Sequence, residues 1–278
     1  MPELPEVETI CRGLAARVLG DRIEAVWLAG KPRTFLSTPQ EIARAMEGAG
    51  IAEVRRMGKH IVIRLSPGGR RTSARAAGAK PLPALVVHLG MTGVLQVTRP
   101  EAQLLKHTHM IARLASGREI RFVDPRRFGR IRVAQDFQVE GREPLEAGFG
   151  EFAALFRKRK TPIKSALLNQ KLLRGVGNIY ADESLFRAGV RPHRQAASLR
   201  REELHRLWIA LRRVLRQAIA AGGSSISDYF DVDGEPGLFQ TRHRVYGRAG
   251  KPCLACGTAI QRIVLAGRGT HYCPKCQR

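Results

Sequence analysis

Acidic residues are scarce in this 278-residue chain. It has 24 Asp and Glu against 48 Lys and Arg, which gives a formal net charge of +24 at pH 7. The composition is otherwise that of a folded protein, with 44% hydrophobic and 26% charged residues, so the excess charge lies on a globular body. Such a surface requires a polyanionic partner. Nucleic acid is the first candidate and an anionic membrane surface the second.

The sequence also lacks a long apolar run and a secretory signal. Its most apolar stretch, residues 84–97, is interrupted by His88 and by glycines, whereas a membrane span needs about 20 consecutive apolar residues. The chain starts with MPELPE, which has neither the basic region nor the apolar region of a signal peptide. We therefore expect no membrane-spanning segment and a cytoplasmic location.

Cysteine is rare, but its spacing is informative. Four of the five cysteines lie in the last 26 residues as two C-x-x-C pairs, Cys253/Cys256 and Cys273/Cys276, with 16 residues between the pairs. In a reducing compartment this spacing is typical of a four-thiolate zinc ribbon, so we expect one structural Zn²⁺ that stabilises a hairpin. Arg268 falls between the pairs, where a hairpin would project it toward a phosphate.

Residues 1–135 have the pattern of a β-rich domain. Apolar residues recur every three or four positions over residues 5–20, which predicts an amphipathic helix with Cys11 on its buried face. Runs with strand chemistry follow at residues 25–28, 51–65, 84–97, 109–115 and 118–123, and Ser116-Gly117 predicts a hairpin turn between the last two. One helix followed by several short strands predicts a β-sandwich or barrel.

After residue 135 the pattern becomes helical. Residues 163–173, 179–188 and 199–220 have helical periodicity, and Ser198 is a candidate N-cap for the longest of these segments. The acidic, glycine-containing segment 138–150 separates the two halves. The expected fold class is thus α+β. We expect a β-sandwich domain at residues 1–135, a linker at 136–158, a helical domain at 159–240 and a zinc finger at 241–278.

The segment LRGVGN, residues 173–178, joins two of the expected helices. Asn178 is a candidate cap for the second helix, whose first N–H groups could bind a phosphate. An ordinary capped turn would use the same residues. The basic run at residues 157–160 and the nearby Lys164 favour binding to a nucleic-acid backbone.

The N-terminus offers a possible nucleophile. Removal of Met1 would expose the secondary amine of Pro2, and an α-amino group has a pKa of about 7.7 to 8.0, so part of it is neutral at physiological pH. Such an amine can attack a sugar carbon and form an iminium, with Glu3 beside it to transfer protons. Alternatively, Glu3, Glu6 and Glu8 only stabilise the N-terminus of the helix.

Several motifs, taken in order, resemble a known family. They are PELPEVET at residues 2–9, GK at 58–59, HLGMTG at 88–93, KH at 106–107, DPRRFG at 124–129, GVGNIYADE at 175–183 and the zinc ribbon. Together they resemble the bacterial formamidopyrimidine-DNA glycosylases over nearly the whole chain. The resemblance implies an N-terminal β-sandwich with a helix that carries Pro2, then a helix-two-turn-helix domain and a zinc-ribbon β-hairpin.

The resemblance also implies an activity and its catalytic residues. Family members are bifunctional glycosylases and abasic-site lyases of base-excision repair, which remove 8-oxoguanine and formamidopyrimidines from double-stranded DNA and act on abasic sites. Pro2 would be the Schiff-base nucleophile and Glu3 the proton donor that opens the sugar. Lys59 would serve β-elimination and Arg268 δ-elimination, because a nearby cation stabilises a departing phosphate.

Further residues are implied by the same resemblance to bind DNA. Phosphate contacts would come from His107, Arg126, Arg159, Lys164 and Asn178. The gap left by the flipped nucleotide would be filled by Met91, Arg126 and Phe128. The polar segment at residues 222–229 would cover the flipped base.

Two features depart from the family pattern. Met57 stands where the family often has a basic residue before the Gly-Lys pair. The segment 66–83 looks longer than usual, and its residues Arg70, Arg71 and Arg75 could add nonspecific affinity for DNA.

Other functions remain possible from the sequence. An endonuclease VIII-like glycosylase would prefer oxidised pyrimidines, although the PELPE start and the Met91, Arg126 and Phe128 trio favour the purine branch. A non-catalytic zinc-ribbon protein that binds nucleic acid would suit the charge and the zinc site, but it would not need Pro2, Glu3 and Lys59. A role on a membrane surface is the least favoured. We expect a monomer that associates with the bacterial nucleoid.

Overall fold

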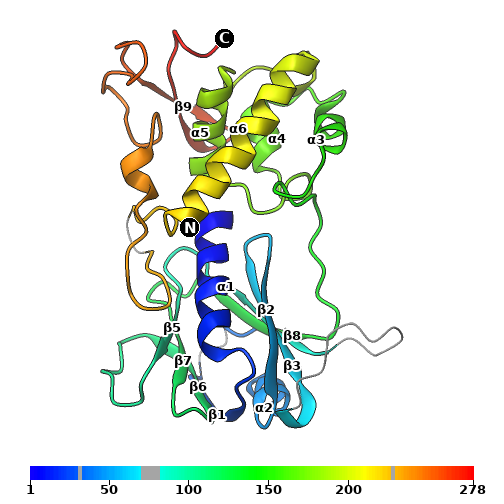
Figure 1. The fold of residues 1–278 in the computed structure, drawn as a ribbon, viewed down its shortest axis with the longest axis vertical. Helices are drawn as coiled ribbons and strands as arrows, with labels where there is room; N and C mark the ends of the chain where they lie inside the picture. Colours follow the sequence, from blue (N-terminus) through cyan, green and yellow to red (C-terminus); the bar gives the residue numbers. More distant parts are fainter. Residues whose placement is uncertain (31–32, 70–81, 227–228) are drawn as a thin grey trace. The chain divides into compact units, whose positions relative to one another are not determined.

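The computed structural model describes residues 1–278 except 31–32, 70–81 and 227–228 (Figure 1). Arg70, Arg71 and Arg75 therefore lie outside the described residues. The chain divides into two compact units. Unit 1 comprises residues 1–138 and 222–237, and unit 2 comprises residues 139–221 and 238–278.

Unit 1 contains two four-stranded antiparallel sheets. One has the order β1-β6-β7-β5, with β1 at Ile23–Leu28, β5 at Val94–Thr98, β6 at Thr108–Leu114 and β7 at Glu119–Val123. The other has the order β2-β3-β4-β8, with β2 at Gly50–Met57, β3 at His60–Ser66, β4 at Ala84–His88 and β8 at Arg130–Ala134. Apolar residues from both sheets form one core, which confirms the β-sandwich.

Helix α1, Leu4–Val18, supplies the rest of this core. Val7, Ile10, Leu14 and Val18 are fully buried, and Cys11 is 3% exposed, as its place on the apolar face predicts. The helix packs against β2 (Figure 1). The expected catalytic residues Pro2 and Glu3 directly precede this helix, which is packed into the core of unit 1.

Three details of unit 1 differ from the sequence-based expectation. The run 51–65 is not one strand but the hairpin β2-β3, because Gly58 adopts a positive φ of 62° and reverses the chain. The run 84–97 forms β4 and β5, which belong to different sheets and are separated at Gly90, where φ is 64°. Helix α2, Pro39–Met46, was not predicted, although Thr38 and Glu41 form a capping box at its start.

Residues 222–237 belong to unit 1, although they were expected in the domain at 159–240. The backbone N–H of Ser224 donates to Oε1 of Glu6 at 2.8 Å, and the Tyr229 hydroxyl donates to the Glu6 carbonyl at 3.3 Å. Arg17 of α1 forms an ion pair with Asp233. These contacts fix the returning segment to α1, and no pattern in the local sequence encodes such a distant pairing.

Unit 2 contains four helices and a β-hairpin among its described residues. The helices are α3 at Phe149–Phe156, α4 at Ile163–Leu168, α5 at Asn178–Ala188 and α6 at Arg201–Ala220, and the hairpin consists of β9 at Gln261–Leu265 and β10 at Arg268–Tyr272. Short 3-10 turns lie at Pro67–Gly69 in unit 1 and at Ala196–Ser198 and Phe239–Arg242 in unit 2.

Helix boundaries in unit 2 correct three expectations. The segment predicted as a linker contains α3, and the helix expected at 163–173 ends at Leu168. Ser198 does not cap the long helix, because Arg200 occupies the N-cap and Glu203 accepts its backbone N–H at 2.8 Å. Among the described residues, no helix is both long and apolar enough to cross a bilayer.

Candidate active site

The N-terminal residues are held at the start of α1. Pro2 is buried, Glu3 is 4% exposed and occupies the N-cap, and Met1 before them is 52% exposed. Pro5 lies in the first turn, where a missing N–H costs no helical hydrogen bond. The chain is therefore ordered up to Pro2, and only Met1 projects from it.

Glu6 organises this terminus, and the sequence analysis gave it only an electrostatic role. Its Oε2 accepts the backbone N–H of Glu3 at 2.8 Å, and its Oε1 accepts that of Ser224. Glu6 is only 2% exposed, and a Cβ added at Gly223 would lie 2.9 Å from its side chain. The three-residue spacing from Glu3 to Glu6 is the signal of a capping box and could have identified this role.

Lys59 lies in the two-residue turn between β2 and β3 and is 9% exposed. Arg56 supports this turn, because its NH1 donates to the Gly58 carbonyl at 3.3 Å and its Nε donates to Glu8 of α1 at 3.0 Å. Met57, the departure from the family pattern, is 7% exposed and ends β2. The turn that carries Lys59 is thus attached to the same helix that carries Glu3.

A histidine pair lies beside this turn. His60 and His88 face each other across β3 and β4, with ring centroids 5.0 Å apart. Burial lowers the pKa of His88 to about 4, and His60, Lys59 and Arg130 contribute in the same direction. His88 is therefore neutral at pH 7, and its Nδ1 can accept the backbone N–H of Gly90 at 3.1 Å.

Two loops present the three residues expected to fill the DNA gap. Met91 is 43% exposed and Phe128 is 46% exposed, and the guanidinium carbon of Arg126 lies 4.7 Å from the Phe128 ring centroid. The loops pass so closely that a Cβ at Gly90 would lie 2.5 Å from the backbone of Phe128. The structure thus places Arg126 against Phe128 and brings the loop that carries the exposed Met91 next to the Phe128 loop.

Asp124 connects these two loops. In the sequence it belongs to the DPRRFG motif, but no role was predicted for it. It is fully buried, accepts the Thr92 hydroxyl at 2.6 Å on Oδ1 and the Gly129 N–H at 2.7 Å on Oδ2. Its own N–H donates to the carbonyl of His107 at 3.1 Å. His107 is exposed and has a positive φ of 70°, so the backbone of Asp124 also helps to position this expected phosphate ligand.

In unit 2, the junction between α4 and α5 is organised by Gln170. Its amide nitrogen donates to the carbonyls of Leu168 and Val176, and its amide oxygen accepts the N–H of Gly175 at 2.9 Å. The expectation that Asn178 caps α5 is wrong, because Gly177 is the N-cap. Instead, the Asn178 amide donates to the carbonyl of Gly269 in the zinc hairpin at 2.9 Å.

Lys164 lies in a different environment from the one expected for a phosphate ligand. It is fully buried, and its Nζ is 2.7 Å from Oδ1 of Asp182. The same nitrogen donates to the Gly269 carbonyl at 2.9 Å and to the Thr270 hydroxyl at 2.8 Å. Because its ammonium is fully buried among these groups, Lys164 joins α4 and α5 to the hairpin instead of facing solvent, where a phosphate would bind.

Arg159 follows α3 and is exposed, as a backbone contact requires. Its Nε donates to the Leu155 carbonyl at 2.7 Å, which caps the C-terminal end of that helix. This hydrogen bond to the end of α3 therefore orients the guanidinium of Arg159.

The four cysteine thiols form a compact group that fits Zn²⁺. All four sulfurs lie within 4.8 Å of one another, with Cys253 and Cys276 separated by 3.9 Å and Cys256 and Cys273 by 3.5 Å. Tetrahedral coordination with Zn–S bonds of about 2.3 Å places sulfurs about 3.8 Å apart. The backbone N–H of Cys276 also points to the sulfur of Cys273 at 3.4 Å, a contact that stabilises a thiolate.

The zinc group supports the hairpin that carries Arg268. Arg268 is exposed and begins β10 directly after the turn at Ala266 and Gly267, which have φ values of 46° and 73°. His271 on the same strand donates its N–H to Asp182 at 2.8 Å. Arg268 therefore projects from a hairpin that zinc holds at one end and Asp182 and Lys164 hold along its side.

Comparison with known proteins identifies the family. Family models match residues 1–131 as the formamidopyrimidine-DNA glycosylase N-terminal domain, residues 141–229 as its H2TH domain, and residues 250–278 as the zinc finger found in FPG and IleRS. The chain belongs to the formamidopyrimidine-DNA glycosylase family. It is thus an enzyme, a DNA glycosylase of base-excision repair with one structural zinc site, and neither alternative function is favoured.

Individual relatives of this glycosylase match over almost their full length. The formamidopyrimidine-DNA glycosylase of Solibacter usitatus is 43% identical over 282 residues and covers 100% of both chains. The crystal structure of the MutM (Fpg) protein from Thermus thermophilus is 43% identical, with a TM-score of 0.83 over 99% of this chain and 98% of that one. A Lactococcus lactis Fpg complex with Fapy-dG-containing DNA is 32% identical, with a TM-score of 0.88 over 100% of both chains.

Proposed function

We propose that this glycosylase removes oxidised purines from double-stranded DNA through a Schiff base on Pro2 and then cleaves the strand by β,δ-elimination. The observation that carries the proposal is the buried Pro2-Glu3 pair at the start of α1. The Glu6 carboxylate holds this pair in place by accepting the backbone N–H of Glu3 at 2.8 Å. An exposed Met1 before a buried Pro2 suits the removal of Met1, which creates the nucleophilic amine.

The first steps take place at the sugar of the damaged nucleotide. The neutral amine of Pro2 attacks C1′ and forms a C–N bond while the bond from C1′ to the base breaks, and the base leaves with a proton. Glu3 donates a proton to the ring oxygen O4′, so the sugar opens and the C1′–N bond becomes an iminium. Because Glu3 is only 4% exposed, its carboxyl group can hold this proton in a defined position.

The eliminations follow from the iminium. It acidifies the C2′–H bond; a base removes that proton, and the electrons expel the 3′ phosphate. A second elimination removes the proton of C4′ and expels the 5′ phosphate from C5′. We assign Lys59 to the first elimination and Arg268 to the second, because a cation stabilises the departing anion. Lys59 lies on a hairpin turn and Arg268 directly after one, and other contacts hold both hairpins.

DNA binding uses residues of both units, of which His107, Arg126 and Arg159 are exposed and Asn178 is half-buried. We propose that His107, Arg126, Arg159 and Asn178 bind the phosphate backbone, and that Met91, Arg126 and Phe128 fill the gap left by the flipped nucleotide. Lys164 acts indirectly, since its buried ammonium holds the carbonyl of Gly269 next to Arg268.

The substrate class rests on the solved relatives. Lactococcus lactis Fpg has been crystallised with DNA containing Fapy-dG, an oxidised pyrimidine or an abasic site. We propose the same class of damaged duplex for this chain, with preference for oxidised purines. We further propose that the protein acts as a monomer in the bacterial cytoplasm and associates there with the nucleoid.

A strand-cleavage assay tests the proposal. We expect the protein to cleave a duplex with one 8-oxoguanine opposite cytosine more rapidly than a duplex with one oxidised pyrimidine, and not to cleave undamaged DNA. Glu3→Gln should abolish strand cleavage, because the sugar cannot open, whereas Glu24→Gln, at an exposed glutamate of β1, should preserve it. Faster cleavage of the pyrimidine lesion would overturn the purine assignment.

A further inference from the structure

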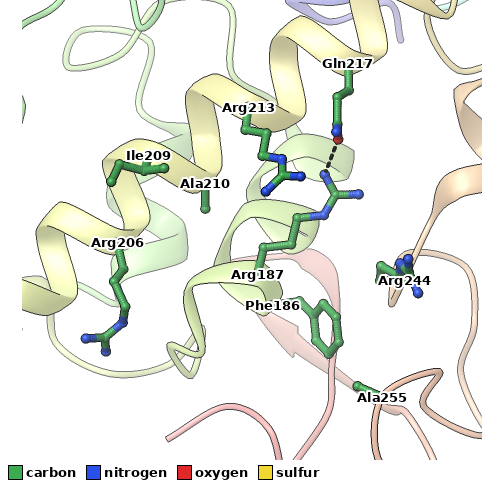
Figure 2. Close-up of a pocket in the computed structure, with 9 residues that line it drawn as sticks. All are labelled: Phe186, Arg187, Arg206, Ile209, Ala210, Arg213, Gln217, Arg244 and Ala255. Atoms are coloured by element: carbon green, nitrogen blue, oxygen red, sulfur yellow. Dashed lines mark hydrogen bonds between the residues drawn. The ribbon is translucent and has the colours of Figure 1, made fainter.

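Unit 2 contains a pocket lined by four arginines that no step of the proposed function uses. It has a volume of about 550 Å³, which lies in the usual range for ligand-binding sites. Arg206 and Arg213 come from α6, Arg187 from α5 and Arg244 from the segment before the zinc finger (Figure 2). No acidic residue is among its described lining residues.

The rest of the lining is apolar and partly exposed. Ile209 of α6 is 47% exposed, Ala210 lies beside it, and Phe186 of α5 packs against the zinc-site core (Figure 2). Exposure of the aliphatic side chain of Ile209, between Arg206 and Arg213, to water is unfavourable. The pocket therefore combines positive charge with an apolar surface.

Internal contacts fix these arginines in place. Arg187 is half-buried and donates from NH1 to Gln217 at 3.0 Å, and the Nε of Arg206 donates to the Ala188 carbonyl at 3.3 Å. The buried Glu183 accepts the backbone N–H of Arg244 at 2.9 Å, so the chain that carries Arg244 is anchored to α5.

The protein neutralises only part of the positive charge in the pocket, because Arg187 pairs with Glu183 at 3.8 Å. Burial lowers the pKa of Arg187, Glu183 raises it, and Arg244 and Arg213 lower it again, which shows that like charges are close together. Within the described part of the chain, neither Arg213 nor Arg244 forms a side-chain ion pair. Binding an anion here would relieve this repulsion.

We propose that this pocket docks a short acidic segment of a partner protein that carries aliphatic or aromatic side chains between its carboxylates. Arg206 and Arg213 are seven residues apart on α6, so their positions span about 10 Å along the helix axis. An extended peptide presents every second side chain on the same face, about 6.6 Å apart. Two carboxylates four positions apart therefore lie about 13 Å apart with one apolar side chain between them on that face, a spread that the long arginine side chains can reach. The intervening apolar side chain would contact Ile209.

The composition of the pocket favours a protein over a nucleic acid. Protein interfaces are enriched in arginine and depleted in lysine, and the pocket has four arginines and no lysine among its described lining residues. Bases bind single-strand sites by stacking on exposed aromatic rings, whereas the exposed apolar residue here is Ile209. The inference is independent of the proposed function, because the pocket is separate from the residue of α5 that is proposed to bind DNA. Arg187 lies nine residues after that residue, Asn178, about 13 Å along α5.

The test measures binding of a labelled peptide to the full-length, zinc-loaded protein. The probe is a fluorescent ten-residue peptide with serine at every second position and with aspartate alternating with leucine or phenylalanine at the positions between, so that acidic and apolar side chains share one face. Anisotropy is recorded at about 150 mM salt, where long-range charge effects are screened. Arg213→Ala is compared with Arg216→Ala, because both arginines are exposed on α6 but only Arg213 lines the pocket. Ile209→Ser tests the apolar contact.

We expect Arg213→Ala to weaken peptide binding about tenfold, as for loss of a charged hydrogen bond, and Arg216→Ala to change it less than about twofold. Ile209→Ser should also weaken it about tenfold. Cleavage of damaged DNA should be unchanged in all three variants. Equal losses for Arg213→Ala and Arg216→Ala would overturn the proposal, and so would stronger competition by a ten-nucleotide single-stranded DNA than by unlabelled peptide.

Discussion

Replacing Lys164 by Met should destabilise unit 2 strongly. The ammonium and the Asp182 carboxylate are 1% and 0% exposed and 2.7 Å apart, so the substitution leaves a buried carboxylate without its counter-ion. Breaking such a pair by removing one partner costs about 3 to 5 kcal/mol. The carbonyl of Gly269 keeps the Asn178 amide at 2.9 Å, so the loss should lie at the lower end of this range.

A double-mutant cycle separates the charge from the packing. Asp182→Asn added to Lys164→Met removes the buried charge and retains an oxygen for the N–H of His271. We therefore expect the double variant to lose less stability than Lys164→Met alone, by about 1 to 2 kcal/mol. Lys171→Met is the matched control, since Lys171 is 78% exposed and its ion pair should contribute less than about 1 kcal/mol.

Urea unfolding followed by tryptophan fluorescence measures these changes. The two tryptophans lie in different units, Trp27 on β1 and Trp208 on α6, where its indole N–H donates to the Ala147 carbonyl at 3.0 Å. In a Trp27→Phe background the signal comes from unit 2. A loss of less than about 1 kcal/mol for Lys164→Met would refute the reasoning that the pair is buried and essential to hairpin docking.

Three further predictions concern other parts of the structure. The ring of His88 should titrate near pH 4 by NMR, so its contribution to stability is complete above about pH 6.5 and declines as the pH falls from there toward 4. Cys273→Ser or a zinc chelator should unfold the hairpin, which circular dichroism and loss of DNA binding would report. Gly90→Ala should weaken binding of lesion-containing duplex at least tenfold by displacing the Phe128 loop, whereas Gly117→Ala, with a similar φ but open space, should not.

The features that were predictable from sequence are those encoded by short spacings. The thiolates of the zinc site lie in two C-x-x-C pairs, and the stripe from Val7 to Val18 identified α1. Both patterns depend on residues within a few positions of each other. The β-sandwich was also predictable as a class, because strands and turns recur at short intervals.

Features that depend on distant contacts were not predictable. The basic run upstream suggested that Lys164 binds phosphate, but its place is decided by Asp182, Gly269 and Thr270, up to 106 residues away. Asn178 likewise bonds to Gly269 rather than capping its own helix. The return of residues 222–237 to α1 depends on Glu6, more than 200 residues earlier, which local periodicity cannot reveal.

Borohydride trapping tests the central claim, that Pro2 forms the covalent bond to DNA. The protein is incubated with a duplex carrying one 8-oxoguanine opposite cytosine, reduced with borohydride, digested and analysed by mass spectrometry. We predict a lesion-dependent adduct on the amine of Pro2, with Met1 absent, and its loss or strong reduction in Pro2→Gly. An adduct on a lysine, or no adduct despite tight binding to the duplex, would contradict the assignment of Pro2 as the nucleophile.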